Sequence, residues 1–198
     1  MEEVGSPILL ASKFYKNCKM SRIIAGSKKN IIIDTPRGNQ IRPILARARK
    51  SLFDILSPRL YNACFLDLYA GSGAVGLEAL SRGASWVSFV EISDVCARII
   101  QKNIGKMGFS DQTEVLRYDV KNLPPLSRAY DIVFSGPPYK EQLTAKTLDI
   151  IFNRVILAKD CWVICQHETS EAVPEEAGNI KKFREKKYGQ TILSFYRE

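Results

Sequence analysis

The sequence is poor in metal-binding residues and in long apolar runs. It contains one histidine, His167, and no pair of cysteines in a C-x-x-C arrangement. Because a protein metal site needs several histidine, cysteine or carboxylate ligands placed together, the sequence predicts no metal site. No apolar run approaches the roughly 20 residues of a membrane-spanning helix, and residues 1–19 lack the basic start and apolar core of a signal peptide. We therefore expect a cytoplasmic protein with no membrane partner.

The five cysteines are odd in number, and most of them lie inside apolar runs. This usage is typical of small core residues in a reducing compartment. Cys161 and Cys165 lie four residues apart on a predicted strand, so their side chains are expected on one side. We expect His167 to point to the other side, which leaves the two thiols without a third metal ligand.

The length and the charge of the chain limit its architecture and its partners. With 198 residues, the chain is long enough for one α/β domain with a small appendage. Its formal net charge is +8, which favours polyanions such as nucleic acid as partners. Charge alone also fits a basic protein without such a partner, so the prediction depends on the motifs of the chain.

Residues 65–76, with the sequence FLDLYAGSGAVG, form the stretch around which the other predictions are arranged. A short apolar run leads into a glycine-rich turn and then into a helical pattern, which is how a buried parallel strand connects to a helix. Gly71 and Gly73 allow the backbone to approach a ligand where a Cβ atom would clash. Together with Gly76 they match G-x-G-x-x-G, a pattern that also occurs in NAD and FAD sites.

Two acidic residues change the interpretation of this turn. Asp67 lies inside the strand just before the glycines, and Glu91 ends the next apolar run. Glu91 can accept both ribose hydroxyls of a nucleoside, and an acid at position 67 would repel a pyrophosphate but attract an ammonium and a sulfonium. The charges therefore favour S-adenosyl-L-methionine over a dinucleotide. A tight strand-to-helix connection without a ligand is the alternative.

The pattern of the remaining chain predicts an α/β fold. Regular alternation of strands and helices argues for a mostly parallel sheet covered on both faces, and the end of the chain reads as an antiparallel hairpin. Ser93 can cap the second helix and Gly108 can end it. The expected strands are 65–70, 86–91, 113–117, 130–135, 160–166 and a hairpin over 180–197; the expected helices are 45–56 (closing at Ser57-Pro58), 74–82, 93–107, 141–154 and a short one within 171–178.

The region before the main domain is basic. Two β-branched runs around a polar turn predict a hairpin between residues 22 and 36, and the helix that follows places Arg47 and Lys50 on one face. Either these cations contact phosphates or they are only solvated side chains at the protein surface. We predict an extension over 1–19, a basic β-hairpin appendage over 20–43 and the main domain over 44–198.

A second stretch, residues 130–139 (YDIVFSGPPY), ends another predicted strand with two prolines and an aromatic residue. In open α/β sheets, ligands bind beyond the carboxyl ends of the strands, so this loop should lie beside the glycine turn. Carbonyls held by Gly136, Pro137 and Pro138 can accept the N–H groups of an exocyclic amine, while Tyr139 stacks on the base. The alternative is a rigid loop with a core tyrosine.

A third loop follows the strand over 113–117. Asp119 lies where such a loop reaches the adenine of a bound donor, and Val120 offers a backbone N–H beside it. This assignment depends on topology alone.

These residues resemble the RsmD-type methyltransferases, a bacterial family that methylates the N2 amine of a guanine in small-subunit (16S) ribosomal RNA. The similarity runs from about residue 20 to residue 197. It covers RIIAG at 22–26, LFDIL at 52–56, the whole block 67–83, and the segments YGQT and FYR at 188–191 and 195–197. Pro-Pro followed by an aromatic residue is shared more widely among amino-methyltransferases, so the ends of the chain identify the family.

The resemblance implies a Rossmann-like class I methyltransferase sheet, S-adenosylmethionine as cofactor, and ribosomal RNA or an assembling 30S particle as partner. It implies that the methionine end is bound by Asp67, Tyr69, Gly71 and Gly73, the ribose by Glu91 with Ile92, and the adenine by Asp119 with Val120. It further implies RNA contacts by the N-terminal hairpin and the start of the next helix, namely by Arg22, Lys28, Arg37, Arg42, Arg47 and Arg49.

Three positions depart from the family pattern. Gly136 stands where the family usually has Asp, so the side-chain acceptor for the target amine is missing, and Ser135 should point away by strand alternation. The segment 42–47 lacks the usual threonines and aspartate, and Lys50 replaces a usual Glu. Besides a guanine-N2 methyltransferase, the sequence therefore admits a catalytically weakened RNA-binding assembly factor, a DNA adenine methyltransferase or a dehydrogenase.

Overall fold

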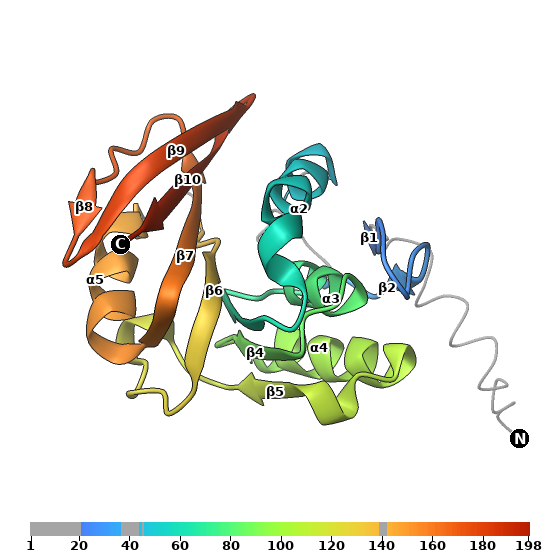
Figure 1. Ribbon diagram of the computed structural model, residues 1–198. Helices are drawn as coiled ribbons and strands as arrows, with labels where there is room; N and C mark the ends of the chain where they lie inside the picture. The colour runs from blue at the N-terminus through green and yellow to red at the C-terminus, as the bar shows by residue number, and fades with distance from the viewer. Residues whose placement is uncertain (1–20, 37–43, 45, 139–141) are drawn as a thin grey trace, which may run out of the picture.

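The computed structural model describes residues 21–36, 44, 46–138 and 142–198, and its central feature is an eight-stranded sheet (Figure 1). The strand order is β5-β4-β3-β6-β7-β10-β9-β8, and β1 and β2 form a separate two-stranded sheet. The strands are β1 (Ser21–Arg22), β2 (Ile32–Ile33), β3 (Cys64–Leu68), β4 (Trp86–Val90), β5 (Thr113–Leu116), β6 (Ala129–Ser135), β7 (Ile156–Glu168), β8 (Glu176–Ala177), β9 (Ile180–Tyr188) and β10 (Thr191–Arg197).

The strand directions confirm the predicted α/β fold class. Strands β5, β4, β3, β6 and β7 are parallel to one another, and β10 is antiparallel to both β7 and β9. Gly189, with φ 62°, makes the turn between β9 and β10 in the left-handed region that glycine adopts without a steric penalty. The chain thus ends in the antiparallel hairpin that its sequence predicts.

Helices cover both faces of the sheet, with α3 and α4 on one side and α5 on the other (Figure 1). Apolar side chains of α2, α3 and α4 pack in one core cluster, and those of α5 and η2 pack in a second cluster on the opposite face. The Ser93 side chain caps α4 and Gly108 ends it, as predicted. The helices are α2 (Ala46–Leu60), α3 (Ala74–Ser81), α4 (Asp94–Met107) and α5 (Thr144–Arg154), with short 3-10 turns η1 (Ser110–Gln112) and η2 (Val120–Asn122).

Two element predictions are wrong. Helix α2 does not close at Ser57-Pro58 but continues to Leu60 with Pro58 inside it, because Leu60 is buried in the core and holds the last turn in place. Residues 171–178 contain no helix but the two-residue strand β8, which pairs with β9. Gly178, at φ 60°, turns the chain back into β9, so β-pairing replaces the expected helix. Strand β7 is also longer than predicted.

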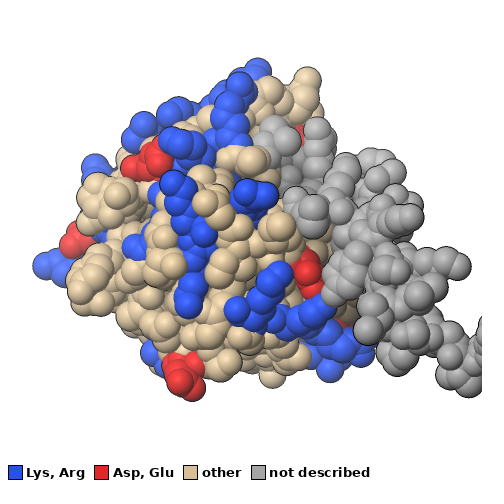
Figure 2. Space-filling view, turned by 90° about the vertical axis from the view of Figure 1, so that its right-hand side faces the viewer, with Lys and Arg blue, Asp and Glu red and all other residues tan. Residues whose placement is uncertain are grey.

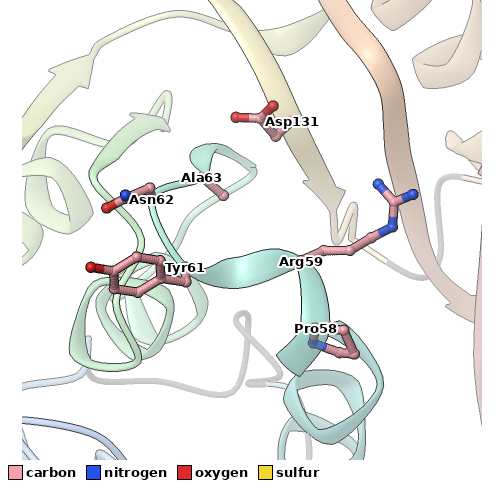
Figure 3. Close-up of a pocket in the computed structure, with 6 residues that line it drawn as sticks. All are labelled: Pro58, Arg59, Tyr61, Asn62, Ala63 and Asp131. Atoms are coloured by element: carbon pink, nitrogen blue, oxygen red, sulfur yellow. The ribbon is translucent and has the colours of Figure 1, made fainter.

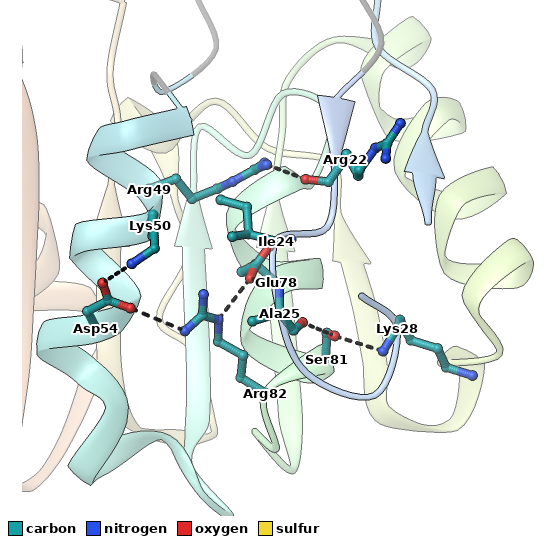
Figure 4. Close-up of polar contacts among 10 residues, drawn as sticks. All are labelled: Arg22, Ile24, Ala25, Lys28, Arg49, Lys50, Asp54, Glu78, Ser81 and Arg82. Carbon is teal, nitrogen blue, oxygen red and sulfur yellow. Dashed lines mark hydrogen bonds and ion pairs between the residues drawn. The ribbon is translucent and has the colours of Figure 1, made fainter. Parts of the chain in front are cut away.

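A buried carboxylate attaches the N-terminal hairpin to α3 (Figure 4). Glu78 is completely buried, and its two oxygens accept the backbone N–H groups of Ile24 at 2.7 Å and Ala25 at 3.0 Å. Arg82 balances the charge, since its Nε lies 2.8 Å from the same carboxylate. The hairpin is therefore held by charge-assisted hydrogen bonds to a helix that covers the sheet rather than by its own two short strands.

The same docking requires a glycine in the hairpin turn. Gly26 has φ +85°, and a Cβ atom at this position would lie 1.8 Å from the carbonyl oxygen of Ser81. Ser27 donates its N–H to that carbonyl at 2.7 Å, and the Ser81 hydroxyl donates to the carbonyl of Ala25 at 2.6 Å. Close contact between the turn and the end of α3 thus explains the glycine. The predicted domain boundaries at 19/20 and 43/44 lie outside the described residues.

Candidate functional site

The two loops singled out by the sequence lie side by side. Their strands, β3 and β6, are neighbours in the sheet, and Leu68 is paired with Ser135. Gly136 donates its N–H to the carbonyl of Leu68 at 3.4 Å, so the proline loop begins where the glycine turn begins. Parallel neighbouring strands end at one edge of a sheet, which brings both loops to a common site.

The glycine turn has the backbone geometry that the sequence predicts. Gly71 and Gly73 have φ values of 58° and 76°, and Gly73 is the N-cap of α3. A Cβ atom on Gly76 would lie 2.3 Å from the ring of Phe89, so this glycine lets α3 pack directly on β4. The first two glycines shape the turn, and the third fixes the helix on the sheet.

Asp67 is a buried carboxyl group directly beneath the turn. It is 2% exposed, and its Oδ2 accepts the N–H of Gly76 at 2.9 Å. Burial raises the pKa of Asp67 to about 8; the bond from Gly76 opposes this rise, and the charge of Glu91 adds to it. A cationic ligand above the turn would favour the ionised form of Asp67, whereas an anionic ligand would not.

Glu91, which follows β4, connects the glycine turn to the start of α4. Its Oε2 accepts the N–H of Gly71 at 2.8 Å, and its Oε1 accepts the N–H of Ser93 at 2.8 Å. These bonds fix the carboxylate while each oxygen retains capacity for another donor, such as a ribose hydroxyl. Ile92, the next residue, is 63% exposed and offers an apolar surface beside it.

Tyr69 shows a contact that the sequence analysis missed. Its φ of 60° lies in the left-handed region, which is uncommon for an aromatic residue and marks a constrained position. The Tyr69 hydroxyl lies 2.9 Å from the Oγ1 of Thr147 in α5, a buried residue 78 positions later. The only possible sequence signal for Thr147 was a polar residue on the buried face of α5. Thr147 therefore joins the site as a residue that positions Tyr69.

The proline loop carries its polar groups on the backbone. Gly136 is half-buried, Pro137 is buried and Pro138 is exposed; Tyr139 lies outside the described residues. Ser135 is completely buried and is paired with Cys165, whose side chain belongs to the core on the α5 side, so it points away from the Asp67 face as predicted. The described loop thus offers main-chain carbonyls to a bound amine.

The third loop has a local structure of its own. Asp119 begins η2 as its N-cap, and its Oδ1 accepts the N–H of Lys121 at 3.0 Å. Val120 is 2% exposed and packs in the core cluster on the α5 side. Strand β5 is separated from β3 by β4 alone, so this loop follows the same sheet edge. The adenine contact assigned to these two residues stays a prediction.

The predicted RNA contacts divide into exposed and buried residues. Arg22 and Arg47 are exposed, and Lys28 is half-buried with its Nζ 5.5 Å from the ring centroid of Phe109. The prediction for Arg49 is wrong: this residue is 3% exposed and donates to the Ser21 hydroxyl and, at 2.6 Å, to the carbonyl of Arg22 (Figure 4). Arg49 lies on the face of α2 that packs against the N-terminal hairpin, and the helical pattern alone could not predict which face would do so.

The exposed cations lie on a strongly basic face. Figure 2 shows lysine and arginine side chains running from the upper edge of this face down across its middle, with few acidic side chains among them. The face carries α2 and the N-terminal hairpin, which lie on the right of Figure 1. Arg37 and Arg42 lie outside the described residues.

The orientation predicted for His167 is wrong. Its Nε2 lies 2.8 Å from the Oγ of Ser194, and Ser194 is paired with Cys165 across β7 and β10. His167 and Cys165 therefore share one face of the strand, because residues two positions apart point to the same side. Within the described part of the chain, no group of three His, Cys, Asp or Glu residues is placed to hold a metal ion. Among those same residues, no helix is long and apolar enough to span a membrane.

A cavity of about 520 Å³ lies at the other end of the sheet (Figure 3). It precedes the start of β3 and lies beside the start of β6, so it is separated from the two loops by the length of these strands. The guanidinium of Arg59 donates to the carbonyl of Asp160 at 2.8 Å and is already engaged. The cavity is lined by Pro58, Arg59, Tyr61, Asn62, Ala63 and Asp131. It takes no part in the site described above.

The residues at the sheet edge fit the methyl donor predicted from the sequence. The turn has glycines where the backbone must come close to a ligand, a carboxyl that burial keeps poorly ionised until a cation arrives, and a fixed carboxylate with free acceptor capacity. A pyrophosphate would meet the acidic groups of Asp67 and Glu91 there, so the sign of the charge favours the cationic methyl donor over a dinucleotide.

Comparison with known proteins identifies the family of the chain. Residues 21–197 match the family described as conserved hypothetical protein 95. YlbH of Bacillus subtilis is 29% identical over 181 residues, covering 89% of this chain and 98% of that protein. Ribosomal RNA small subunit methyltransferase D of Escherichia coli is 30% identical over 175 residues, which is 88% of each chain.

Solved structures agree with this assignment. The structure of yhhF from Escherichia coli superposes with a TM-score of 0.79 at 27% identity and covers 90% of this chain and 97% of that one. The class I methyltransferase fold and the S-adenosylmethionine predicted from the sequence agree with these relatives. The chain therefore belongs to the conserved hypothetical protein 95 family, that of the RsmD-type methyltransferases which its sequence resembles.

Proposed function

We propose that this protein transfers a methyl group from S-adenosylmethionine to the N2 amine of a guanine in small-subunit ribosomal RNA. One observation carries the proposal: the glycine turn and the proline loop begin at paired residues of adjacent strands, Leu68 and Ser135. A donor held over the turn and a base held by the loop then face each other. The named activity of the Escherichia coli relative on small-subunit ribosomal RNA supports the choice of substrate.

The carboxylates of the site bind and orient the donor. S-adenosylmethionine supplies an electrophilic methyl group on a positively charged sulfur. Asp67 faces the cationic end and becomes ionised when that charge arrives, while Glu91 accepts hydroxyl groups of the ribose. Both carboxyls are held by backbone N–H groups, so neither has to move when the donor binds.

The proline loop orients the target amine. The lone pair of an exocyclic amine is delocalised into the ring, so the nitrogen is a weak nucleophile until its N–H bonds are held out of the ring plane. Carbonyls of Gly136 and Pro137 accept these N–H groups, and Tyr139 stacks on the flipped base. The chain needs no base before transfer, because the alkylated nitrogen is acidic and loses its proton to water.

A labelling assay tests the proposal. Small-subunit particles from cells that lack the corresponding methyltransferase are incubated with the protein and methyl-labelled S-adenosylmethionine, and the RNA is digested to nucleosides. Label in N2-methylguanosine is the expected result. Label in adenine of DNA would favour a DNA methyltransferase, and absence of labelled guanine in the RNA would overturn the proposal.

Gly136 favours a second candidate function, a donor-binding assembly factor with weakened catalysis. The position lacks the side-chain acceptor that related enzymes place before the two prolines. A Cβ atom on Gly136 would lie 3.2 Å from the ring of Phe134, so a small shift of this ring makes room for a side chain. If the wild type binds donor and RNA but methylates only as Gly136→Asp, the assembly-factor function is correct. Gly136→Ala is the matched control, since it adds the Cβ atom without an acceptor.

A further inference from the structure

The closed end of the β9–β10 hairpin carries cations that the function proposed above does not use. Strand β9 has the sequence IKKFREKKY, and Arg184, Lys186 and Lys187 are exposed near its end. Figure 1 shows this end of the hairpin at the upper edge of the molecule, next to α2. These three cations form what we call the hairpin cations.

The hairpin cations are not neutralised by the protein. Within the described residues, none of the three has an ion-pair partner, although Lys186 lies 5.9 Å from the ring centroid of Tyr188. The acidic residue between them, Glu185, is engaged elsewhere: it accepts from Lys182 at 3.0 Å and from the Ser194 hydroxyl at 2.9 Å. The unpaired charges of Arg184 and Lys186 on one face of β9, and of Lys187 on the other, repel one another, and a bound polyanion would remove that repulsion.

Two of the hairpin cations lie on the face that carries α2. Lys186 is paired with Leu193 and Arg184 with Phe195, and both apolar partners belong to the core cluster beneath α2. Tyr188, on the same face, donates its hydroxyl proton to Ser51 of α2. The hairpin end is thereby fixed beside the first turns of α2, where Arg47 is exposed.

The hairpin end also lies at the sheet edge that holds the site. Thr191 is paired with Glu168, three residues beyond Cys165, which is paired with Ser135 at the end of β6. Through β10, Lys186 and Lys187 are level with Gln166 and His167, one and two residues beyond Cys165, while Arg184 is level with Ile164. At about 3.3 Å per residue and about 4.8 Å between strands, the two lysines are about 3 to 7 Å beyond the start of the proline loop and about 14 Å to its side. A single RNA segment entering the site can therefore reach both.

We propose that the hairpin cations form a second RNA-contacting surface, which binds the phosphates of the segment next to the target guanine. The N-terminal hairpin and α2 would then hold the RNA on one side of the proline loop and the C-terminal hairpin on another. Exposed lysine and arginine side chains contact phosphates without reading the base sequence. This surface therefore adds affinity and positions the RNA but does not select the target base. The inference rests on the proposed function, from which it takes its ligand.

The test compares two triple variants of equal charge. One is Arg184→Gln, Lys186→Gln and Lys187→Gln. The control is Arg128→Gln, Lys159→Gln and Lys181→Gln, which removes three exposed cations at the opposite ends of β6, β7 and β9. Binding of in vitro transcribed small-subunit ribosomal RNA is measured at several salt concentrations, with thermal unfolding and S-adenosylmethionine affinity as checks of the fold.

The expected result is a change in salt dependence confined to the hairpin variant. Loss of three phosphate contacts should reduce the slope of log affinity against log salt by roughly 2 to 3 and weaken binding about tenfold. The KM for small-subunit particles should rise while kcat stays the same, because the cations do not touch the reacting atoms. Donor affinity should not change.

The inference is overturned if the hairpin variant and the control variant have the same slope and the same KM. The RNA-binding measurement needs no turnover, so it separates this inference from the proposed function. If the wild type labels no guanine, the proposed function is wrong. If the wild type labels guanine but the hairpin variant binds RNA as the wild type does, only the second RNA-contacting surface is wrong. If the triple variant is less stable than the wild type, the single variant Lys186→Glu repeats the test.

Discussion

The glycine turn and the basic face of this protein differ in how their charged groups are held. The acidic groups of the turn, Asp67 and Glu91, are buried, and each accepts hydrogen bonds from backbone N–H groups. The cations of the basic face, such as Arg22 and Arg47, are exposed, and so are the hairpin cations. A methyl transfer requires fixed geometry, whereas phosphate contacts depend on charge density and tolerate motion. A single substitution in the turn should therefore reduce donor binding strongly, whereas each substitution on the basic face should reduce RNA affinity by a small step.

The turn of the N-terminal hairpin is an exception to this contrast, and it gives the largest effect that we expect. Although Arg22 and Lys29 of this hairpin are exposed, its backbone is docked as tightly as the glycine turn. Gly26→Ala would place a Cβ atom 1.8 Å from the Ser81 carbonyl, at φ +85°. We expect a loss of about 3 kcal/mol or more in the free energy of unfolding, measured by denaturant titration.

Gly108→Ala is the control for Gly26→Ala. Gly108 also has a positive φ, +70°, but a Cβ atom on it meets nothing within 4 Å. Only the conformational cost of about 1 kcal/mol should remain there. Equal losses for the two variants would show that the hairpin does not dock on α3 as described.

The next largest effect concerns Asp67, the buried acid of the turn. Asp67→Asn keeps an acceptor for the N–H of Gly76 but removes the charge that faces the donor. We expect S-adenosylmethionine affinity, measured by calorimetry, to fall roughly 10-fold to 100-fold, the value of one hydrogen bond to a charged group. Asp94→Asn, at an exposed acid of α4, should leave the affinity unchanged. A neutral effect of Asp67→Asn would contradict the donor assignment.

The pKa of Asp67 also leads to a pH dependence, whose effect on donor affinity is smaller than that of Asp67→Asn. Burial raises the folded-state pKa to about 8, above the unfolded value of 3.8, so between these values the folded state binds the extra proton. The free energy of unfolding should therefore fall as pH rises from about 4 to about 8. Donor binding needs the ionised acid, so affinity should rise about tenfold from pH 7 to pH 9.

The Asp67→Asn variant provides the reference for both pH profiles. Because an asparagine side chain cannot ionise, the part of the pH dependence that Asp67 causes should disappear in the stability and in the donor affinity of this variant. Profiles that are identical in the two proteins would show that another group titrates in this range.

The smallest effect that we expect is on donor affinity, from loss of the hydrogen bond between Tyr69 and Thr147. Thr147→Val removes the partner of the Tyr69 hydroxyl, a single hydrogen bond of about 1 kcal/mol. Donor affinity should fall about threefold to fivefold. Thr147→Ser should restore it, because serine keeps the hydroxyl. A loss of affinity that serine does not restore would mean that Thr147 acts through packing alone.

The geometry of the glycine turn was predicted from the sequence because its residues are close together in the chain. The strand, the glycines and the start of the helix lie within residues 65–76, and turn geometry there follows from glycine's freedom at positive φ. Ser93 and Gly108 marked the ends of α4 for a similar local reason. The short helix within 171–178 was predicted wrongly because β8 exists only through its pairing with β9, which no local pattern contains.

Contacts between distant parts of the chain escaped the sequence analysis for a physical reason. Arg49 looked like a surface cation, but its helix packs against the hairpin and buries the guanidinium. Thr147 reaches Tyr69 across 78 positions, and Glu78 accepts from Ile24 across 54. Polar side chains of this kind carry no periodic signal, because each is fixed by buried hydrogen bonds to a distant segment.

The sequence by itself determined the alternation of strands and helices, the glycine turn, the two acids beside it and the excess of positive charge. These follow from backbone freedom, apolar periodicity and composition, which are local properties of the chain. The tertiary structure alone decided which cations remain exposed, how the N-terminal hairpin docks on α3, and that the C-terminal hairpin ends beside α2. Those outcomes depend on which faces of the helices and hairpins pack together. Packing depends on contacts between residues far apart in the chain, so no local pattern determines it.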